Sequence, residues 1–317
     1  MKIFRSIEQA AGELSASGAA ITIGTFDGVH RAHARILQTL TEKARSLGVK
    51  SAVLTFSPHP RAFFAPQQGV RLLSDEREKA ALIERMGVDA LIVQPFSREF
   101  AALPAETFLR DLLAGKLRTR AVITGYDHSF GCEKHNAFRF LEAASGAYGI
   151  EAVLVPRMEI DGITVSSSAV RRALEGGDIR LAEKLLGRPY GFYGTVVQGK
   201  RLGRTIGYPT ANIRVDSPDK LLPPDGVYAV RVTMGGESFA GMMNIGMRPT
   251  IDDYPGRSIE VNIFDFDRDI YGRTLTVEII AWVRSEIKFS SIDNLKQQLA
   301  KDAAACRALL EGGKAPF

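Results

Sequence analysis

The chain has 317 residues, a formal net charge of +5, and hydrophobic and charged fractions of 45% and 24%, which are average for a globular protein. These values exclude a collagen-like, low-complexity or disordered chain, and the length exceeds that of a usual single domain. A charge of +5 dispersed over this length suits small anionic substrates and does not indicate nucleic acid.

The first 14 residues alternate charged and apolar side chains without a continuous apolar run. This pattern predicts neither a signal peptide nor a transmembrane helix, so we expect a cytoplasmic protein that does not bind membranes. The two cysteines, Cys132 and Cys306, lack C-x-x-C spacing. We therefore expect reduced thiols rather than a disulfide framework or a zinc site.

The first half of the chain alternates short apolar runs with amphipathic helix patterns. The predicted strands are residues 19–24, 51–56, 89–94, 121–125 and 151–155. The predicted helices are residues 34–47, 75–86, 105–114, 137–148, 167–175 and 179–186. This alternation predicts an α/β domain with a doubly wound parallel sheet, in which ligands bind where strands end and helices begin.

After residue 187 the sequence changes to β-type runs separated by glycines. These runs are residues 193–197, 226–234, 238–245, 258–266 and 274–283, and a helix pattern follows over residues 292–310. The change predicts an antiparallel barrel with a terminal helix. We place the domain boundary at residue 186, which gives domains 1–186 and 187–317.

The segment from Gly24 to His33 connects the first predicted strand to the first predicted helix. His30 and His33 can share one face of the first helical turn, where unpaired backbone N–H groups and the helix dipole favour an anion. Nucleotidyl transfer by in-line attack on an α-phosphorus needs positioning and charge stabilisation, which two histidines can supply. Histidines at such a spacing are also common as surface or capping residues, so both interpretations stay open from spacing alone.

Three serines at residues 166–168 precede or begin the helix predicted at 167–175. Arg171 lies four residues after Ser167 and therefore on the same helix face. Hydroxyls and a guanidinium suit the β- and γ-phosphates of a nucleotide. A serine run by itself is most often a helix N-cap, which is the alternative interpretation.

Taken together, these two segments resemble the adenylyltransferase module of bacterial bifunctional riboflavin kinase/FAD synthetases, which is similar to the wider HxGH nucleotidyltransferase superfamily. The resemblance implies catalytic roles for His30 and His33, and ATP contacts for Gly24, Phe26, Asp27, Gly28, His30, His33, Ser167, Ser168 and Arg171. Segments 55–60 and 124–131 also match the module. They imply flavin contacts for Phe56, His59, Pro60 and Asp127, with Asp127 orienting FMN or a magnesium ion. The chain departs from the family at Ala32, where a glycine is usual, and at Cys132 and Glu133, where a basic residue is usual.

The segment from residue 194 to 212 contains more glycines than a hairpin needs. Its glycines can bring backbone N–H groups to a phosphate, while the Thr210 hydroxyl and the Asn212 carbonyl offer hard oxygen ligands for magnesium. Turns and bulges are the alternative reading of such a segment. Residues 209–212, Pro-Thr-Ala-Asn, resemble the signature of riboflavin kinase, whose fold is a six-stranded Greek-key barrel. The resemblance implies that Thr210 and Asn212 bind magnesium and ATP phosphates, and that Gly199, Lys200 and Gly203 line the loop above them.

Phosphoryl transfer to the ribityl hydroxyl requires a group nearby that accepts the hydroxyl proton. Glu260 is our candidate base, because residues 259–266 resemble the Glu-bearing strand of the kinase. Strand alternation puts Glu260 and Asn262 on one face, and Asn262 replaces a histidine common in the family. A solvated strand carboxylate is the alternative from spacing alone. The resemblance also implies flavin contacts for Asn244, Arg284 and Phe289.

The sequence therefore predicts an enzyme that phosphorylates riboflavin with ATP and then adenylylates FMN to FAD with release of pyrophosphate, using Mg²⁺. One alternative is a riboflavin kinase with a degenerate adenylyltransferase domain. The other is a non-catalytic flavin-binding regulator, which Glu260 and Thr210 disfavour because binding alone needs no base. The expected partners are riboflavin, FMN and ATP, without nucleic acid, and the sequence does not predict the oligomeric state.

Overall fold

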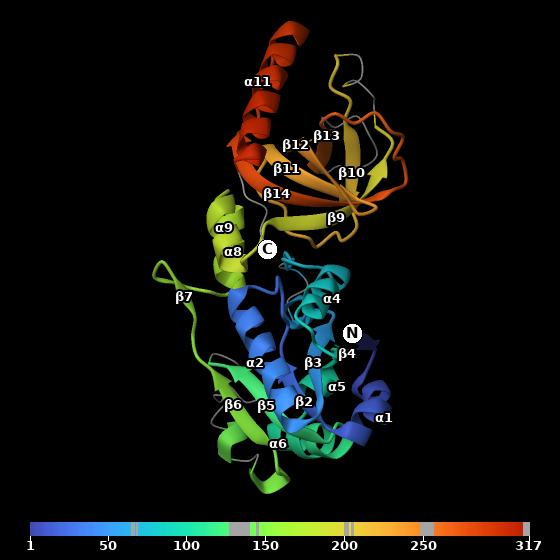
Figure 1. The fold of residues 1–317 in the computed structure, drawn as a ribbon, viewed down its shortest axis with the longest axis vertical. Helices are drawn as coiled ribbons and strands as arrows, with labels where there is room; N and C mark the ends of the chain where they lie inside the picture. The colour runs from blue at the N-terminus through green and yellow to red at the C-terminus, as the bar shows by residue number, and fades with distance from the viewer. Residues whose placement is uncertain are drawn as a thin grey trace. The chain divides into compact units, whose positions relative to one another are not determined.

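Six parallel strands form the sheet of the N-terminal part, in the order β1-β4-β3-β2-β5-β6 (Figure 1). The computed structural model describes residues 1–64, 67, 69–126, 140–143, 146–199, 203, 206–247 and 257–312. The strands are β1 Lys2–Phe4, β2 Ala19–Ile23, β3 Lys50–Ser57, β4 Ala90–Pro95, β5 Thr119–Gly125 and β6 Glu151–Val155. Every residue of the central strand β2 is buried, as expected for a parallel sheet covered on both faces.

Helices cover both faces of this sheet. One core contains Ile7 and Leu14 of α1 and Leu113 of a π-helix, and the other contains Leu37 and Leu40 of α2. The helices of this part are α1 Ile7–Ser17, α2 Arg31–Leu47, α3 Pro60–Phe64, α4 Glu76–Arg85, α5 Arg98–Ala101, α6 Ala105–Thr107, the π-helix Phe108–Lys116 and a 3-10 turn Gly146–Tyr148. A short hairpin of β7 Glu159–Ile160 and β8 Ile163–Thr164 follows the sheet.

The structure adds β1 and α1, which the sequence patterns did not predict. Strand β1 has three residues with only Phe4 buried, too few for a period of two to be recognised. Helix α1 begins after Ser6, whose hydroxyl accepts a hydrogen bond from the Gln9 N–H at 3.2 Å. Ile7 and Leu14 of this helix are buried, although the first residues show no continuous apolar run.

The helix predicted over residues 105–114 is α6 followed by the π-helix. The Leu117 N–H bonds the carbonyl of Leu112, five residues earlier, which widens the turn. Leu109, Leu113 and Leu117 are all fully buried, so the wider turn keeps residues four apart on the core side. The helix predicted over 137–148 lies partly outside the described residues, and residues 140–143 are helical.

A closed antiparallel barrel of six strands, in the order β10-β13-β12-β11-β14-β9, forms the C-terminal part. Its strands are β9 Tyr190–Val197, β10 Ala211–Val215, β11 Gly226–Met234, β12 Glu237–Met247, β13 Arg257–Ile263 and β14 Thr274–Arg284. Helix α11, Ile292–Glu311, packs Cys306 and Leu299 against Val227 and Met242 of the barrel. This architecture confirms the predicted fold class. Strand β10, which begins at the end of the glycine-rich segment, was not among the predicted strands.

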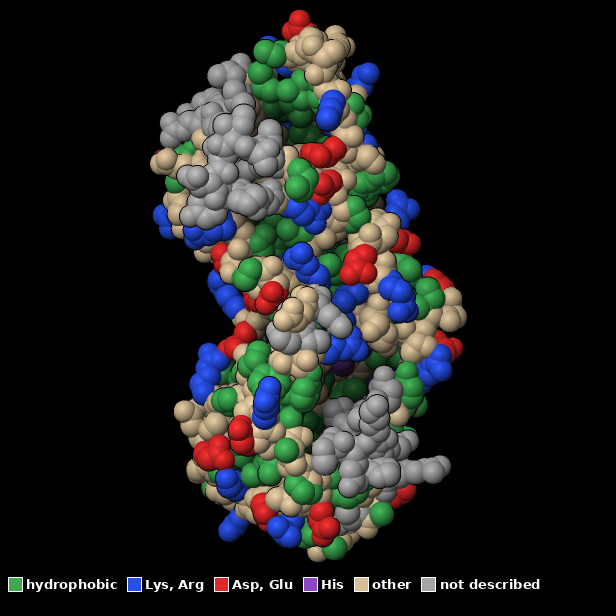
Figure 2. Space-filling view, turned by 180° about the vertical axis from the view of Figure 1, so that it is seen from behind, with side chains coloured by type: hydrophobic (Ala, Val, Ile, Leu, Met, Phe, Trp, Pro, Cys, Tyr) green, Lys and Arg blue, Asp and Glu red, His purple; other side chains and the backbone are tan. Residues whose placement is uncertain are grey.

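The chain divides into two compact units, Met1–Ser167 and Ser168–Phe317. Helices α8, Ser167–Glu175, and α9, Ile179–Leu186, keep the bounds predicted from the sequence. No helix within the described ranges is long and apolar enough to cross a bilayer. Figure 2 shows Lys and Arg side chains interspersed with Asp and Glu on the face drawn, which fits a small net charge spread over the chain.

Candidate active sites

His30 and His33 meet at the N-terminus of α2. His30 is the N-cap residue, and its Nδ1 accepts a hydrogen bond from the His33 backbone N–H at 3.3 Å. The two rings stack with centroids 3.6 Å apart and an interplanar angle of 14°, and the His33 ring lies 4.9 Å from the ring of Phe26. The pair therefore lies in the first turn, where the helix dipole favours an anion.

The loop that carries these histidines has an unusual backbone. Phe26 and Val29 adopt positive φ values of 47° and 39°, a conformation that non-glycine residues rarely hold without support from their surroundings. At Gly28 φ is 79°, and a Cβ there would lie 2.8 Å from the side chain of Leu73. Only glycine fits this close approach, so the loop depends on the segment that contains Leu73.

Asp27 connects the loop to the same segment. Its buried carboxylate accepts hydrogen bonds from the N–H groups of Leu73 at 2.9 Å and Ser74 at 3.0 Å. The Ser74 hydroxyl in turn accepts from the Gly28 N–H at 2.9 Å. Asp27 was predicted to contact ATP; in the structure its carboxylate fixes the shape of the loop, and direct nucleotide contact stays a prediction.

The predicted phosphate-binding serines lie at the start of α8. The Ser167 hydroxyl donates to the backbone carbonyl of Asp27 at 2.9 Å, which brings this serine to the histidine loop. Ser168 and Arg171 belong to the second unit, and their part in the site stays a prediction. Gly24 lies directly after β2, and a Cβ there would lie 3.1 Å from the ring of Phe26.

The residues predicted to bind flavin follow β3. Phe56 lies near the end of that strand, with the rings of Phe96 and Phe100 at 5.5 and 5.7 Å. His59 accepts a hydrogen bond from the Arg61 N–H at 3.1 Å, and Pro60 begins α3. Asp127, also predicted here, lies outside the described residues.

A cavity of about 70 Å³ connects this region with the histidine loop. Its lining includes Asp27 of the loop, Phe56 and His59 of the predicted flavin region, and Thr55 and Lys79. Lys79 was not singled out from the sequence, because a lysine in an amphipathic helix pattern is normally solvated. Here it is only 9% exposed.

In the barrel, the structure brings Thr210 and Glu260 into contact. The Thr210 hydroxyl donates to Oε2 of Glu260 at 3.3 Å. Asn212 of β10 and Asn244 of β12 are the register partners of Glu260 on its two neighbouring strands. Asn262 is on the same side of β13, where its amide donates to the Pro209 carbonyl at 2.7 Å. Residues 209–212 and strand β13, which carries Glu260, therefore form one site.

Two cavities adjoin this site. One, of about 260 Å³, is lined by Glu260, Asn244, Arg284 and Phe289, so it joins the predicted base to the predicted flavin residues. The other, of about 490 Å³, is lined by alternate residues of β13 and by the turn 266–271. Thr210 lines both cavities.

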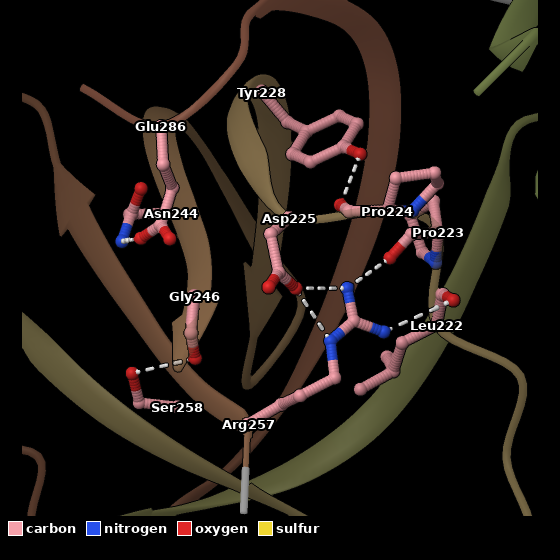
Figure 3. Close-up of polar contacts among 10 residues, drawn as sticks. All are labelled: Leu222, Pro223, Pro224, Asp225, Tyr228, Asn244, Gly246, Arg257, Ser258 and Glu286. Atoms are coloured by element: carbon pink, nitrogen blue, oxygen red, sulfur yellow. Dashed lines mark hydrogen bonds and ion pairs between the residues drawn. The ribbon is translucent and has the colours of Figure 1, made fainter. Parts of the chain in front are cut away.

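Glu286 also lines the smaller cavity, although no sequence motif points to it. Its carboxylate accepts a hydrogen bond from the Asn244 side-chain amide at 3.4 Å (Figure 3). A Cβ at Gly246 would overlap this carboxylate. Its position between the barrel and the last helix gives no strand or helix pattern that could have singled it out.

Arg257, the first residue of β13, contacts the segment that precedes β11 (Figure 3). Its guanidinium bonds the Asp225 carboxylate at 2.7 Å and the carbonyls of Leu222 and Pro223. The Tyr228 hydroxyl donates to the carbonyl of Pro224 at 2.6 Å. The Arg257 contacts hold the segment that precedes β11 against the start of β13.

Arg284, predicted to contact flavin, forms a buried ion pair with Asp302 of α11. Its Nη2 and Nε lie 2.7 and 3.0 Å from Oδ2 of Asp302, and Gln298 donates to the same carboxylate at 2.8 Å. The guanidinium carbon lies 5.9 Å from the centre of the Phe289 ring. Arg284 therefore attaches the terminal helix to the barrel and supports the Phe289 wall of the cavity.

The glycine-rich loop is described at two of its three predicted positions. The backbone at Gly199 passes so close to Asn212 that a Cβ would overlap the amide of that side chain. The Gly203 carbonyl accepts a hydrogen bond from the Tyr208 N–H at 2.9 Å, and Gly203 lines the smaller cavity. Lys200 lies outside the described residues.

Comparison with known proteins identifies two family models and several relatives that match this chain over most of its length. A family model described as FAD synthetase matches residues 13–169, and one described as riboflavin kinase matches residues 186–310. The bifunctional riboflavin kinase/FMN adenylyltransferase of Haemophilus influenzae is 40% identical over 309 residues, covering 97% of this chain and 99% of the relative. The protein of the same description from Escherichia coli K12 is 38% identical over 308 residues, covering 97% of each chain. A crystal structure from Streptococcus pneumoniae, described as a macrolide-efflux protein, is 30% identical with a TM-score of 0.86, covering 97% of this chain and 99% of that one.

Proposed function

The chain belongs to the family of bifunctional riboflavin kinases/FMN adenylyltransferases, and from this premise we propose which of its residues carry each reaction. It is an ATP-using transferase of flavin biosynthesis, with riboflavin, FMN and ATP as substrates. It phosphorylates riboflavin to FMN and adenylylates FMN to FAD. The assignment of residues, metal and domain limits is our proposal.

For the kinase, we assign the flavin to the cavity of about 260 Å³ and the nucleotide to the cavity of about 490 Å³. The observation that carries this assignment is the contact between Thr210, which lines both cavities, and Glu260. A terminal hydroxyl of riboflavin beside Glu260 would lie close to Thr210, which borders the cavity assigned to the nucleotide. Glu260 accepts the hydroxyl proton while the oxygen attacks phosphorus, and the Thr210 hydroxyl orients the carboxylate.

The donor set of this site fits magnesium. The Thr210 hydroxyl, the Asn212 amide oxygen and the Glu260 carboxylate come from residues that are in contact or in register, and all three are hard oxygen donors. Thr210 and Asn212 would hold the ion together with ATP phosphates. When bound, the ion would neutralise charge on the phosphate oxygens. The family uses a divalent metal, and we propose Mg²⁺ for this chain.

For the adenylyltransferase, we assign the triphosphate to the N-terminus of α2. The stacked rings of His30 and His33, the Gly24 and Gly28 loop, and the Ser167 hydroxyl at Asp27 surround this position. The histidines stabilise charge that develops as an FMN phosphate oxygen attacks the α-phosphorus and pyrophosphate leaves. Phe56, with its ring partners, offers an apolar surface for the flavin ring.

We keep the functional boundary near residue 186, where the riboflavin kinase match begins. Helices α8 and α9, with the predicted phosphate-binding residues Ser167, Ser168 and Arg171, then fall on the adenylyltransferase side of this boundary. We also propose that the enzyme works in the cytoplasm, where riboflavin and ATP are available to a chain without a membrane-spanning helix in its described residues.

The test of this proposal is an assay of the purified chain with riboflavin and ATP, in which flavins are separated by chromatography and detected by fluorescence. After treatment with EDTA, Mg²⁺, Mn²⁺ or Ca²⁺ is added back separately. We expect FMN and then FAD, with Mg²⁺ restoring both steps. If riboflavin gives FMN but no FAD, and supplied FMN also gives no FAD, the adenylyltransferase assignment fails and only the kinase assignment remains. Bound flavin without either product would contradict both residue assignments.

A further inference from the structure

Lys79 has a buried side-chain amine, which lies near the carboxyl end of strand β3. It lies on α4, is 9% exposed and lines the cavity of about 70 Å³ beside Thr55, Phe56 and His59. Lysine is among the residue types least often buried without a paired charge. Burial lowers the pKa of Lys79, while the nearby Asp27 charge acts in the opposite direction. A desolvated ammonium at this position therefore has a strong electrostatic preference for an anion.

The acidic groups around Lys79 have other partners. Asp27 accepts hydrogen bonds from the backbone N–H groups of Leu73 and Ser74. Glu76 pairs with Arg5, and Asp75 caps α4 by accepting from the Glu78 N–H at 2.7 Å. These three carboxylates act on the Lys79 ammonium through their charge at a distance, and none of them forms a direct ion pair with it.

Among the described residues, the ammonium of Lys79 makes a single hydrogen bond, to Oγ1 of Thr55 at 3.4 Å. An ammonium has three N–H donors, so donor capacity remains on the side of the cavity. The Thr55 hydroxyl in turn donates to the carbonyl of Thr25 at 3.2 Å. This chain of contacts places the ammonium where β2 and β3 end, the edge at which open α/β sheets bind ligands.

The cavity has the size of a small anion. Its volume of about 70 Å³ is far below the volumes of about 260 and about 490 Å³ of the two barrel cavities, so it suits a phosphate group better than a whole flavin. Its walls include Phe56 and His59 of the proposed flavin region and Asp27 of the proposed nucleotide loop. A phosphate bound here would lie between the two substrates.

We propose that Lys79 binds the phosphate monoester of FMN in the adenylyltransferase and selects FMN over riboflavin. The inference rests on the proposed adenylyl-transfer site. Riboflavin differs from FMN only by this phosphate, so a cation placed for it distinguishes the two flavins. Lys79 exchanges no proton: it holds the FMN phosphate while one of its oxygens forms the bond to the α-phosphorus and pyrophosphate departs.

The test compares the full-length chain with its Lys79→Met variant in adenylylation of supplied FMN, with FMN and ATP varied separately. Both chains also carry Glu260→Gln, so that riboflavin added as a competitor is not phosphorylated. We expect the KM for FMN to rise about 10- to 100-fold, the range of a lost hydrogen bond to a charged group. The KM for ATP and the inhibition constant of riboflavin should stay within about twofold.

Lys116→Met is the matched control, because Lys116 is 43% exposed and pairs with Glu8 at 2.8 Å on the surface of the same unit. It should leave both KM values unchanged. Lys79→Arg keeps the charge and should recover part of the affinity for FMN. If the methionine variant does not fold, Lys79→Gln replaces it with the same expected outcome.

An unchanged KM for FMN would overturn the inference. So would a rise in the KM for ATP alone, which would assign the anion to the nucleotide, or an equal rise in both KM values with a lower melting temperature, which would make Lys79 structural. Failure of the parent chain to adenylylate FMN would instead refute the proposed function before any lysine variant is compared.

Discussion

Thr210 and Glu260 are fifty positions apart in the sequence, yet the threonine hydroxyl donates to the glutamate carboxylate at 3.3 Å. The contact exists because β10 pairs with β13, which sets Asn212 opposite Glu260. Thr210 lies just before β10 and borders both barrel cavities. The proposed proton acceptor for the flavin hydroxyl and the proposed ligand for the nucleotide metal are therefore neighbours because of strand register.

Replacing Glu260 with glutamine should abolish the kinase step while leaving adenylylation. Glutamine keeps the size and can still accept from Thr210, but it cannot take up the hydroxyl proton. We expect the rate of FMN formation from riboflavin to fall about 10²- to 10⁴-fold. Chromatography of flavins from reactions supplied with riboflavin or with FMN measures the two steps separately. Equal loss of both would contradict the assignment of Glu260 to the kinase.

Replacing either histidine of the α2 terminus should suppress FAD formation only. His33→Ala removes one ring of the stacked pair at this helix terminus, so we expect the rate of FAD formation to fall about 10²- to 10³-fold and FMN formation to be unchanged. Undiminished FAD synthesis would remove His33 from the site.

His30 needs a different substitution, because it also caps α2. Alanine would lose the cap at a stability cost of about 1 kcal/mol, whereas His30→Asn retains a capping acceptor. We expect His30→Asn to lose FAD formation with a melting temperature near that of the parent chain. A variant that keeps its adenylyltransferase rate would show that His30 serves the helix and not the reaction.

Gly199→Ala should impair the kinase by displacing Asn212. The added methyl group overlaps the Asn212 amide, so either the loop or the asparagine must move. We expect the Mg²⁺ concentration for half-maximal FMN formation to increase several-fold, by about 1 kcal/mol of lost metal binding. Titration of activity with Mg²⁺ measures this. Gly146→Ala is the control, because its φ is not positive and a Cβ there meets nothing within 4 Å.

Asp302→Asn should loosen α11 from the barrel. Asp302 is buried, and removing its charge leaves the Arg284 guanidinium, 17% exposed, without its carboxylate. We expect a loss of about 3 kcal/mol in the free energy of unfolding of this unit and a higher KM for riboflavin. Chemical denaturation followed by the fluorescence of the single tryptophan, Trp282, measures the stability.

The matched control for this pair is Asp265→Asn. Asp265 joins Arg307 of the same helix at 2.8 Å, but its side chain is 77% exposed. Asparagine also tolerates the positive φ of 56° at this position. A change below about 1 kcal/mol is expected. Similar losses from Asp265→Asn and Asp302→Asn would show that burial does not set the strength of these pairs.

Asp89 should stabilise the N-terminal unit at neutral pH and lose this effect in acid. Burial alone would raise the pKa of Asp89, but hydrogen bonds from the Ser51 N–H at 2.9 Å and hydroxyl at 2.8 Å outweigh it and hold the pKa below its ordinary value. The carboxylate thus contributes stability above its unfolded pKa of about 3.9, and this is lost as the pH falls through the folded value. Denaturation of the parent and Asp89→Asn chains at pH 7 and at about pH 3 should give a stability difference that shrinks in acid. A constant difference would contradict it.

The sequence by itself determined the fold class, the order of most elements and the family, because periodic apolar runs and short motifs are local. The strand–glycine loop–helix segment around His30 and the segment ending at Asn212 each carry their chemistry within about twenty residues. Helices α8, α9 and α11 begin and end within one residue of their predicted limits, since caps and periodicity lie in the same short stretch.

Only the tertiary structure decided which side chains contact one another, and which of the predicted site residues have structural partners instead. Arg284 pairs with Asp302, the Asp27 carboxylate accepts hydrogen bonds from Leu73 and Ser74, and Glu286 reaches Asn244, because strand register and helix packing join segments that are distant in the chain. Lys79 has the most consequential placement. A helix pattern gives a lysine no reason to be buried, and only the packing of α4 on the sheet removes its ammonium from water and turns it toward the cavity.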